Sequence, residues 1–153
     1  VRTWPVALSD RRGTVALSTS SNNLGDTKGI RATDRLVASV ISPSIPLDEL
    51  LGDLKVDLVK IDVQGAEMAV LRGMEGIIAR SPAIRIVMEF APSLLQADGM
   101  DPEDVLRSLR DRGFELNLVR SDAYFVADDA EIINFCHSAG PHGQANLLLT
   151  RAS

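Results

Sequence analysis

Apolar and polar positions near the start of the chain follow the short alternation that is typical of strands. Apolar runs at residues 6–8 and 15–17 flank the polar turn DRRG, which predicts a hairpin. Residues 18–29 are rich in Ser, Asn, Gly and Asp and predict a loop, and a further short β-type run covers residues 37–41. The first part of the chain therefore predicts small strands and turns rather than helices.

The middle of the chain has the pattern of a strand, a helix and a second strand. Residues 56–63 are mostly apolar and rich in β-branched side chains, which is typical of a strand covered on both faces. Residues 66–80 repeat apolar side chains at the period of an amphipathic helix, and the Ser81-Pro82 step ends it. The run IRIVMEF at residues 84–90 predicts the next buried strand.

The last third of the chain continues this alternation. Asp101 and Pro102 predict a helix start, since an acid suits the N-cap and proline suits the first turn, and Gly113 ends that helix. Residues 128–136 are ambiguous. Further strands are expected at residues 114–119, 124–126 and 145–150. The order predicts one α/β domain over residues 1–153, with a mainly parallel sheet and an antiparallel C-terminal edge.

Composition narrows the classes of partner. The 153 residues carry 16 Lys and Arg against 21 Asp and Glu, a net charge of -5, which disfavours nucleic acid as a partner. Cys136 is the single cysteine, so no internal disulfide framework is possible and a reducing compartment is expected. No apolar stretch is long enough to span a membrane, and the first ten residues lack signal-peptide regions. We expect a cytoplasmic protein with no membrane partner.

Charged side chains gather where the two central strands should end. Lys60 and Asp62 lie two apart, so they share one face of their strand, and Glu89 has the matching place on the next strand. Ligands of open α/β sheets bind at the carboxyl ends of strands. Asp62 is therefore either half of an ion pair with Lys60 or an acid that positions a substrate or acts as a base.

Glu67 follows the central strand and its glycine turn. It falls on the same helical stripe as Val70, Leu71 and Met74, so its carboxylate should point inward and needs a partner. Either it satisfies the helix end or a neighbouring lysine, or it faces a polar ligand cleft. The spacing leaves both interpretations open.

Several phrases of the chain together resemble the FkbM family of S-adenosylmethionine-dependent methyltransferases. The strongest is KIDVQGAE followed by VLRG, with Gln64 where many relatives have Glu. The others are VALSDRRGTVAL, SNNLG, LDELL, IVMEF before a proline, and EDVLRSLRDRGFEL. The resemblance covers nearly the whole chain and is densest from Leu47 to Phe90.

This resemblance implies a class I methyltransferase fold, Rossmann-like, with S-adenosylmethionine bound at the carboxyl ends of the strands. It implies that cofactor-binding residues include Leu8, Ser9 and Asp62. It also implies that Asp62 and Glu67 are the catalytic candidates beside the methyl-transfer centre. We expect a small-molecule or glycan hydroxyl as the acceptor, contacted by Lys60, Gln64, Glu89 and Asn23. For Asn23, ordinary turn chemistry is an equal explanation.

One part of the family's pattern is missing from the sequence. Upstream of Val6 there is neither a glycine-rich loop nor a strand ending in a ribose-binding acid. We therefore expect a domain that lacks its N-terminal strands, taken from a longer protein, although a processed N-terminus would also explain the missing Met. A non-catalytic fragment or interaction module is the competing interpretation, and exposed edges could drive homo-oligomerisation.

Metal chemistry is a weaker interpretation. Asp62, Glu67 and Glu89 are carboxylates that would suit a hard cation. Cys136, His137 and His142 match no strong zinc spacing, and a polar loop with an incidental thiol explains them better. No metal is expected.

Overall fold

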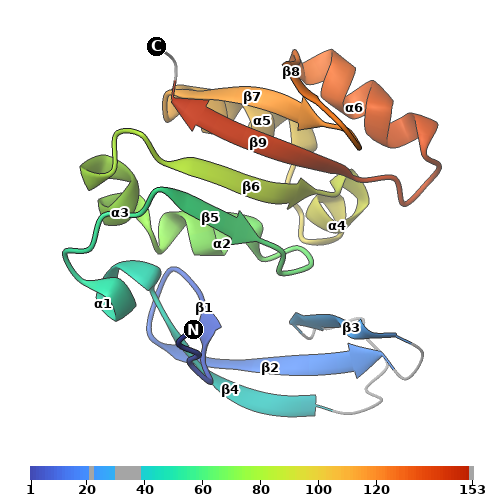
Figure 1. Ribbon diagram of the computed structural model, residues 1–153. Helices are drawn as coiled ribbons and strands as arrows, with labels where there is room; N and C mark the ends of the chain where they lie inside the picture. The colour runs from blue at the N-terminus through green and yellow to red at the C-terminus, as the bar shows by residue number, and fades with distance from the viewer. Residues whose placement is uncertain (21–22, 30–38, 152–153) are drawn as a thin grey trace. The chain divides into compact units, whose positions relative to one another are not determined.

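A computed structural model of the protein describes residues 1–20, 23–29 and 39–151 (Figure 1). It divides into two compact units, each built from two stretches of sequence. The first unit comprises Val1–Lys55 and Val63–Arg80, and the second comprises Val56–Asp62 and Ser81–Ser153. Within the described residues, no helix has the length and apolar character needed to cross a membrane.

The first unit contains a four-stranded sheet in the order β1-β4-β2-β3. Its strands are β1 (Ala7–Leu8), β2 (Gly13–Ser20), β3 (Asn23–Gly29) and β4 (Ser39–Ile45). The predicted hairpin between β1 and β2 is wrong, because β4 lies between them, parallel to β1 and antiparallel to β2. The predicted loop is also wrong, because β2 and β3 pair antiparallel through it. Ladder hydrogen bonds between these backbones override the low strand propensity of Gly, Asn and Asp.

The same unit contains three short helices, α1 (Leu47–Leu51), α2 (Glu67–Arg72) and α3 (Glu75–Arg80). The single helix expected over residues 66–80 is interrupted at Gly73 and Met74. In an unbroken helix the Ile77 N–H would donate to the Gly73 carbonyl. Here Ile77 donates to the Asp48 carboxylate at 2.7 Å, and the Gly73 carbonyl accepts from the Asp48 N–H at 2.9 Å.

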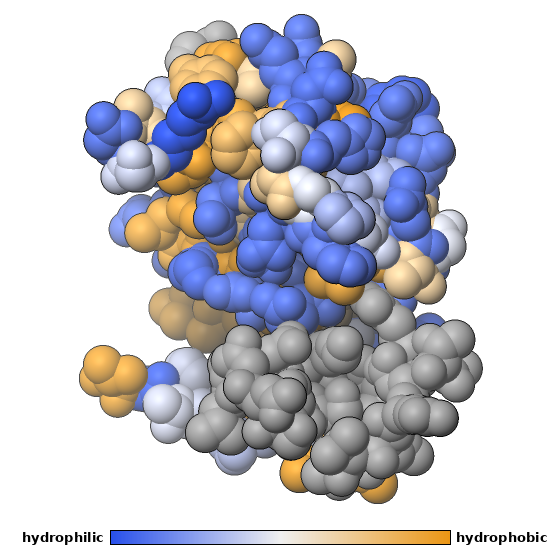
Figure 2. Space-filling view, turned by 90° about the vertical axis from the view of Figure 1, so that its right-hand side faces the viewer, coloured by the Kyte–Doolittle hydropathy of each residue, from blue (hydrophilic) through white to orange (hydrophobic). Residues whose placement is uncertain are grey.

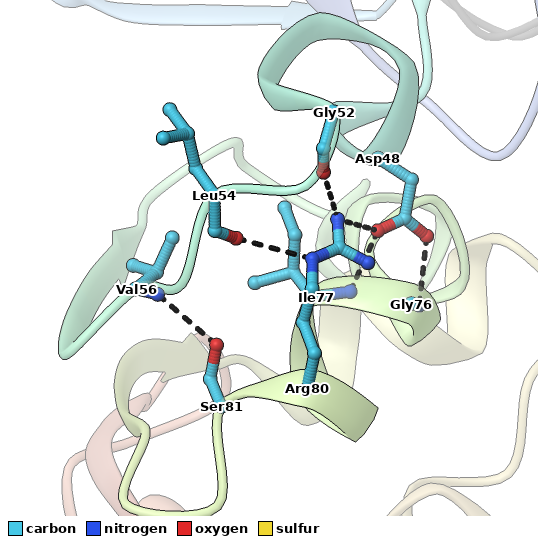
Figure 3. Close-up of polar contacts among 8 residues, drawn as sticks. All are labelled: Asp48, Gly52, Leu54, Val56, Gly76, Ile77, Arg80 and Ser81. Carbon is cyan, nitrogen blue, oxygen red and sulfur yellow. Dashed lines mark hydrogen bonds and ion pairs between the residues drawn. The ribbon is translucent and has the colours of Figure 1, made fainter.

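Asp48 is the centre of a compact polar network in this unit (Figure 3). Its second carboxylate oxygen accepts from the Gly76 N–H at 2.8 Å, and Arg80 donates to its first oxygen at 3.3 Å. Arg80 also donates to the carbonyls of Gly52 and Leu54. The network ties Asp48 at the start of α1 to both ends of α3, and Gly52 after α1 to the end of α3.

The second unit contains a five-stranded sheet in the order β5-β6-β9-β7-β8. Its strands are β5 (Leu58–Ile61), β6 (Arg85–Phe90), β7 (Phe114–Val119), β8 (Tyr124–Val126) and β9 (Ala145–Arg151). Only β5 and β6 are parallel, whereas β9 is antiparallel to both of its neighbours and β8 is antiparallel to β7. The antiparallel C-terminal edge is therefore present. The prediction of a mainly parallel sheet is wrong, because β7 and β8 join through a short turn that permits only antiparallel pairing, and β9 returns between β6 and β7.

Helices α4 (Pro92–Ala97), α5 (Pro102–Asp111) and α6 (Asp129–Ser138) belong to this second unit. The predicted start of α5 is confirmed, because the Asp101 side chain accepts from the Glu103 N–H at 2.9 Å. The ambiguous segment is helical and begins with a reciprocal capping box between Asp128 and Glu131. Cys136 lies on α6 and is buried, so the expectation of a polar loop around it is wrong.

Strand β5 is shorter than predicted and lies at the edge of its sheet. Leu58 is 62% exposed, and Lys60 is exposed as well. The expectation of a strand covered on both faces is therefore wrong. An apolar, β-branched run resembles both a buried strand and an edge strand, and only the neighbouring elements distinguish them.

Candidate functional site

Lys60 and Asp62 form an ion pair at the carboxyl end of β5. Their Nζ and Oδ2 atoms lie 2.6 Å apart, and the two side chains are 64% and 46% exposed. Positions two apart on a strand project to the same face, which explains why the pair forms locally. Because both groups remain in water, the pair contributes only about 0–1 kcal/mol to stability. It leaves a carboxylate accessible to solvent.

Glu89 lies level with Asp62 on the neighbouring strand. The register pairs Lys60 with Val87 and Ile61 with Met88, and one further step aligns Asp62 with Glu89. Both residues therefore lie at the carboxyl ends of adjacent parallel strands, which are about 4.8 Å apart. Figure 2 views the side of the molecule at which β5 and β6 end, and hydrophilic residues predominate in the upper part of that view.

Gln144 is a contributor that the sequence analysis missed. Its Nε2 donates to Glu89 Oε1 at 2.6 Å. Gln144 directly precedes β9, and β9 begins alongside the end of β6 because the two strands are antiparallel. Recognising that antiparallel pairing from the sequence would have identified Gln144. The carboxyl ends of β5 and β6 therefore hold Lys60, Asp62, Glu89 and Gln144.

Glu67 is directed inward, as the helical stripe predicted. It is 4% exposed, and its two carboxylate oxygens accept from the Gly65 N–H at 3.1 and 3.0 Å. Gln64 and Gly65 both have positive φ, 52° and 105°, so the chain turns through left-handed backbone here. Glu67 thus stabilises the turn between β5 and α2, which supports the structural interpretation of this acid.

Leu8 and Ser9 lie at the end of β1, beside the last turn of α2. The Ser9 N–H donates to the Ile45 carbonyl at 3.2 Å, and a Cβ at Gly73 would lie 2.0 Å from the Ser9 carbonyl oxygen. Glu67 is in the first turn of the same helix, about 9 Å along the axis at 1.5 Å per residue. The cofactor-binding candidates Leu8 and Ser9 are therefore at the opposite end of α2 from Glu67.

Asp10 follows Ser9 and pairs with Arg72 of α2, with Nε and Oδ2 3.1 Å apart. The hydrogen bond from Arg72 is the main cause that lowers the pKa of Asp10 below its usual value. Asp10 is thereby held as a carboxylate whose charge is compensated within the first unit.

Two predicted residues remain. Gln64 lies in the turn before α2, where its φ is 52°. Asn23 is the first residue of β3, opposite Ser20, rather than part of a loop. The candidates divide between the units: Lys60, Asp62 and Glu89 belong to the second, and Leu8, Ser9, Asn23, Gln64 and Glu67 to the first. Among the described residues, no group of three or more His, Cys, Asp or Glu side chains could hold a metal ion.

Comparison with known protein families identifies the domain. The model of the methyltransferase FkbM domain matches residues 1–116 of the 153. The chain belongs to the FkbM methyltransferase family. The FkbM match includes every site residue named from the sequence, ends within β7, and does not reach Gln144. Neither the curated proteins nor the solved structures contain a match to the chain.

Proposed function

We propose that this FkbM-family chain serves an S-adenosylmethionine-dependent transfer of a methyl group to a hydroxyl oxygen of a sugar or another small metabolite. The family match over residues 1–116 is the observation that carries the proposal. The match spans β5 and β6, whose ends carry Lys60, Asp62 and Glu89.

The acceptor side of this reaction suits the cluster at the ends of β5 and β6. Carboxylates such as Asp62 and Glu89 accept hydrogen bonds from hydroxyl groups, and Lys60 holds Asp62 in place at 2.6 Å. Positioning the acceptor oxygen supplies most of the catalysis in such a transfer, and a nearby acid can take up its proton. We assign that proton to Asp62, because its side chain is 46% exposed whereas Glu67 is buried.

The donor side fits the described residues less well. A nucleoside cofactor needs backbone N–H donors at a glycine turn and an acid for the ribose. The Gly65 N–H is bound by Glu67, and Asp10, the acid that follows β1, is paired with Arg72. For this reason no step of the reaction is assigned to the described residues on the donor side.

Calorimetric titration with S-adenosylmethionine tests the proposal directly. We expect a saturable heat at up to millimolar cofactor. A flat titration would refute the claim that this chain retains a donor site. A transfer assay over a panel of sugars and small hydroxyl compounds then follows.

The transfer assay uses Asp62→Asn and a matched control, Asp122→Asn. Asp122 is an exposed acid in the turn between β7 and β8, and β7 is three strands from β5 in the sheet order, so its variant changes the same charge at a distance from Asp62. We expect Asp62→Asn to lower kcat/KM by about 10²–10⁴-fold, the range of general-base catalysis, and Asp122→Asn to leave it unchanged. Equal activity in both variants would remove Asp62 from the reaction.

A second candidate function is a non-catalytic interaction module. The internal pairing of Glu67 and of Asp10 favours it, since both acids already act in the fold of the first unit. This alternative predicts no cofactor heat and no transfer, with the chain still folded cooperatively.

A further inference from the structure

Gln144 lies beyond the FkbM match, unlike Lys60, Asp62 and Glu89. Its Nε2 donates to Glu89 Oε1 at 2.6 Å, within the second unit. An ionised carboxylate only accepts hydrogen bonds, so the amide must turn its nitrogen toward Glu89 and its carbonyl oxygen away from it. The contact is therefore directional, and it depends on an amide at one position and a carboxylate at the other.

The register of β6 and β9 explains why this contact forms. Glu89 pairs with Asn146, and Phe90 pairs with Ala145, so Gln144 is two positions before the partner of Glu89. Diagonal neighbours of this kind across an antiparallel ladder are within reach of long side chains. Asn146 is exposed and directly opposite Glu89, so a second amide lies beside the same carboxylate.

The connection between α6 and β9 fixes the backbone in front of Gln144. Gly143 lies so close to the end of α6 that a Cβ there would be 1.8 Å from the Cys136 carbonyl oxygen. Cys136 is buried, and its Sγ lies 3.8 Å from the carbonyl oxygen of Phe90, the residue after Glu89. Cys136 thus links the loop that carries Gln144 to the end of the strand that carries Glu89.

A carboxylate bonded to an amide suits two neighbouring hydroxyl groups. A carboxylate has about four lone-pair positions, so Glu89 accepts from a hydroxyl in addition to Gln144. The Gln144 amide has a second N–H to donate and a carbonyl oxygen to accept, so it pairs with a hydroxyl in either sense. The two side chains together therefore match a pair of hydroxyls on adjacent carbons.

We propose that Gln144 is a specificity-determining residue of the acceptor site, and that two adjacent hydroxyls of the acceptor bind between the Glu89 carboxylate and the Gln144 amide. This inference rests on the proposed methyl transfer, because it concerns the acceptor of that reaction. Adjacent hydroxyls distinguish sugars and cyclic polyols from phenols and simple alcohols. A site built to hydrogen-bond a hydroxyl rejects the analogue that lacks it, because the polar groups of the site then lose their partner.

Saturation-transfer NMR on the full chain, without cofactor, tests this inference. Methyl α-mannoside is the probe. Its competitors are two isomers of cyclohexanediol, one with hydroxyls on adjacent carbons and one with hydroxyls on opposite carbons. We expect the mannoside to bind at millimolar concentration and only the adjacent isomer to displace it. A parent chain that binds no mannoside, or equal displacement by the two isomers, overturns the proposal.

Exchange of the two side chains tests the pair itself. Gln144→Glu places two carboxylates against each other and should raise the Kd of the mannoside by about tenfold or more. Adding Glu89→Gln restores one amide and one carboxylate, so the double variant should recover most of the affinity. A residue with a merely structural role would not give this recovery, and a double variant that binds no better than Gln144→Glu contradicts the assignment.

The matched control is Gln96→Glu, the same chemical change at an exposed position of α4. It should leave the Kd of the mannoside unchanged, and a rise equal to that of Gln144→Glu would count against a specific role of Gln144. Circular dichroism confirms that each variant folds, and the comparison of the two diol isomers needs no variant at all.

The result is separate from that of the S-adenosylmethionine titration. Selective binding of adjacent hydroxyls without any cofactor heat would support the role of Gln144 and refute the transfer by this chain. Cofactor heat without that selectivity would retain the transfer and refute the role of Gln144.

Discussion

The Asp48 carboxylate accepts the Ile77 N–H at 2.7 Å, in place of the Gly73 carbonyl that an unbroken helix would use. The Asp48 N–H occupies that carbonyl in turn. Asp48 thus supplies an acceptor for the Ile77 N–H and a donor for the Gly73 carbonyl, and this exchange separates α2 from α3. Since Arg80 also contacts the Asp48 carboxylate, the network joins α1, α2 and α3 of the first unit.

Asp48→Asn should destabilise the first unit. The amide keeps one acceptor oxygen but loses the charge that faces Arg80 and one of the two backbone N–H bonds. Hydrogen bonds to charged groups contribute about 1.5–3 kcal/mol, so we expect a loss of that order in the free energy of unfolding. Urea denaturation measures it, with the exposed Asp53→Asn as the control. An equal effect of both variants would contradict the assigned role.

Gly73→Ala should destabilise the protein more than an alanine at Gly13. A Cβ at Gly73 would lie 2.0 Å from the Ser9 carbonyl oxygen, whereas a Cβ at Gly13 would make only an ordinary contact of 3.5 Å with Ser44. Because backbone must move to relieve the first contact, the cost should be about 1–3 kcal/mol or more. Thermal unfolding of the two variants compares them directly. Similar melting temperatures would rule out the close approach of β1 to α2.

Glu67→Ala and Glu67→Gln separate the two roles of this acid. Alanine leaves the buried Gly65 N–H without its partner and should cost about 1–3 kcal/mol, while glutamine retains an acceptor oxygen and most of the stability. Urea denaturation of both variants is the measurement. If glutamine proves as destabilising as alanine, the negative charge rather than the hydrogen bond holds the turn. If Glu67→Gln leaves methyl transfer unchanged, Glu67 is structural.

Cys136 should react slowly with thiol reagents in the folded protein. Burial raises the pKa of its thiol to about 11, from a usual value of 9.0, so the reactive thiolate is scarce at neutral pH. The unfolded chain ionises at the lower value, so this thiol's contribution to stability is present below pH 9 and is lost as the pH rises toward 11. Iodoacetamide labelling with and without denaturant tests the first expectation. Equal rates in both conditions would contradict the burial.

A denaturation series from pH 8 upward tests the second expectation, with Cys136→Ala as the control. The variant should lose less stability than the parent over the alkaline range. Parallel decline of the two proteins would assign the loss to other groups.

Local signals were sufficient where a few adjacent residues decide the structure. The acid and proline at Asp101 and Pro102 predicted the start of α5, and the apolar run of β6 was also identified. The two-residue period of a strand also placed Lys60 and Asp62 on one face, which made an ion pair one of the two interpretations of Asp62. The capping box between Asp128 and Glu131 was equally local, and that reciprocal pattern would have identified α6.

Other features depend on residues far apart in the sequence. The break between α2 and α3 requires Asp48, which lies almost thirty positions before Ile77. Strand β4 lies between β1 and β2, and β9 lies between β6 and β7. No local sequence pattern identifies these pairing partners. Gln144 reaches Glu89 only because those strands are antiparallel.

The amino-acid sequence by itself determined the family, through motifs spread along the chain. It also determined the central strand–turn–helix run and the inward direction of Glu67, because each of these depends on residues close together in the sequence. Only the tertiary structure decided that Glu67 binds the Gly65 N–H, that Gln144 donates to Glu89, and that β5 is the first strand of its sheet rather than a central one. The physical reason is that periodicity specifies which face a side chain occupies. The partner on that face depends on backbone hydrogen bonds and packing between distant segments.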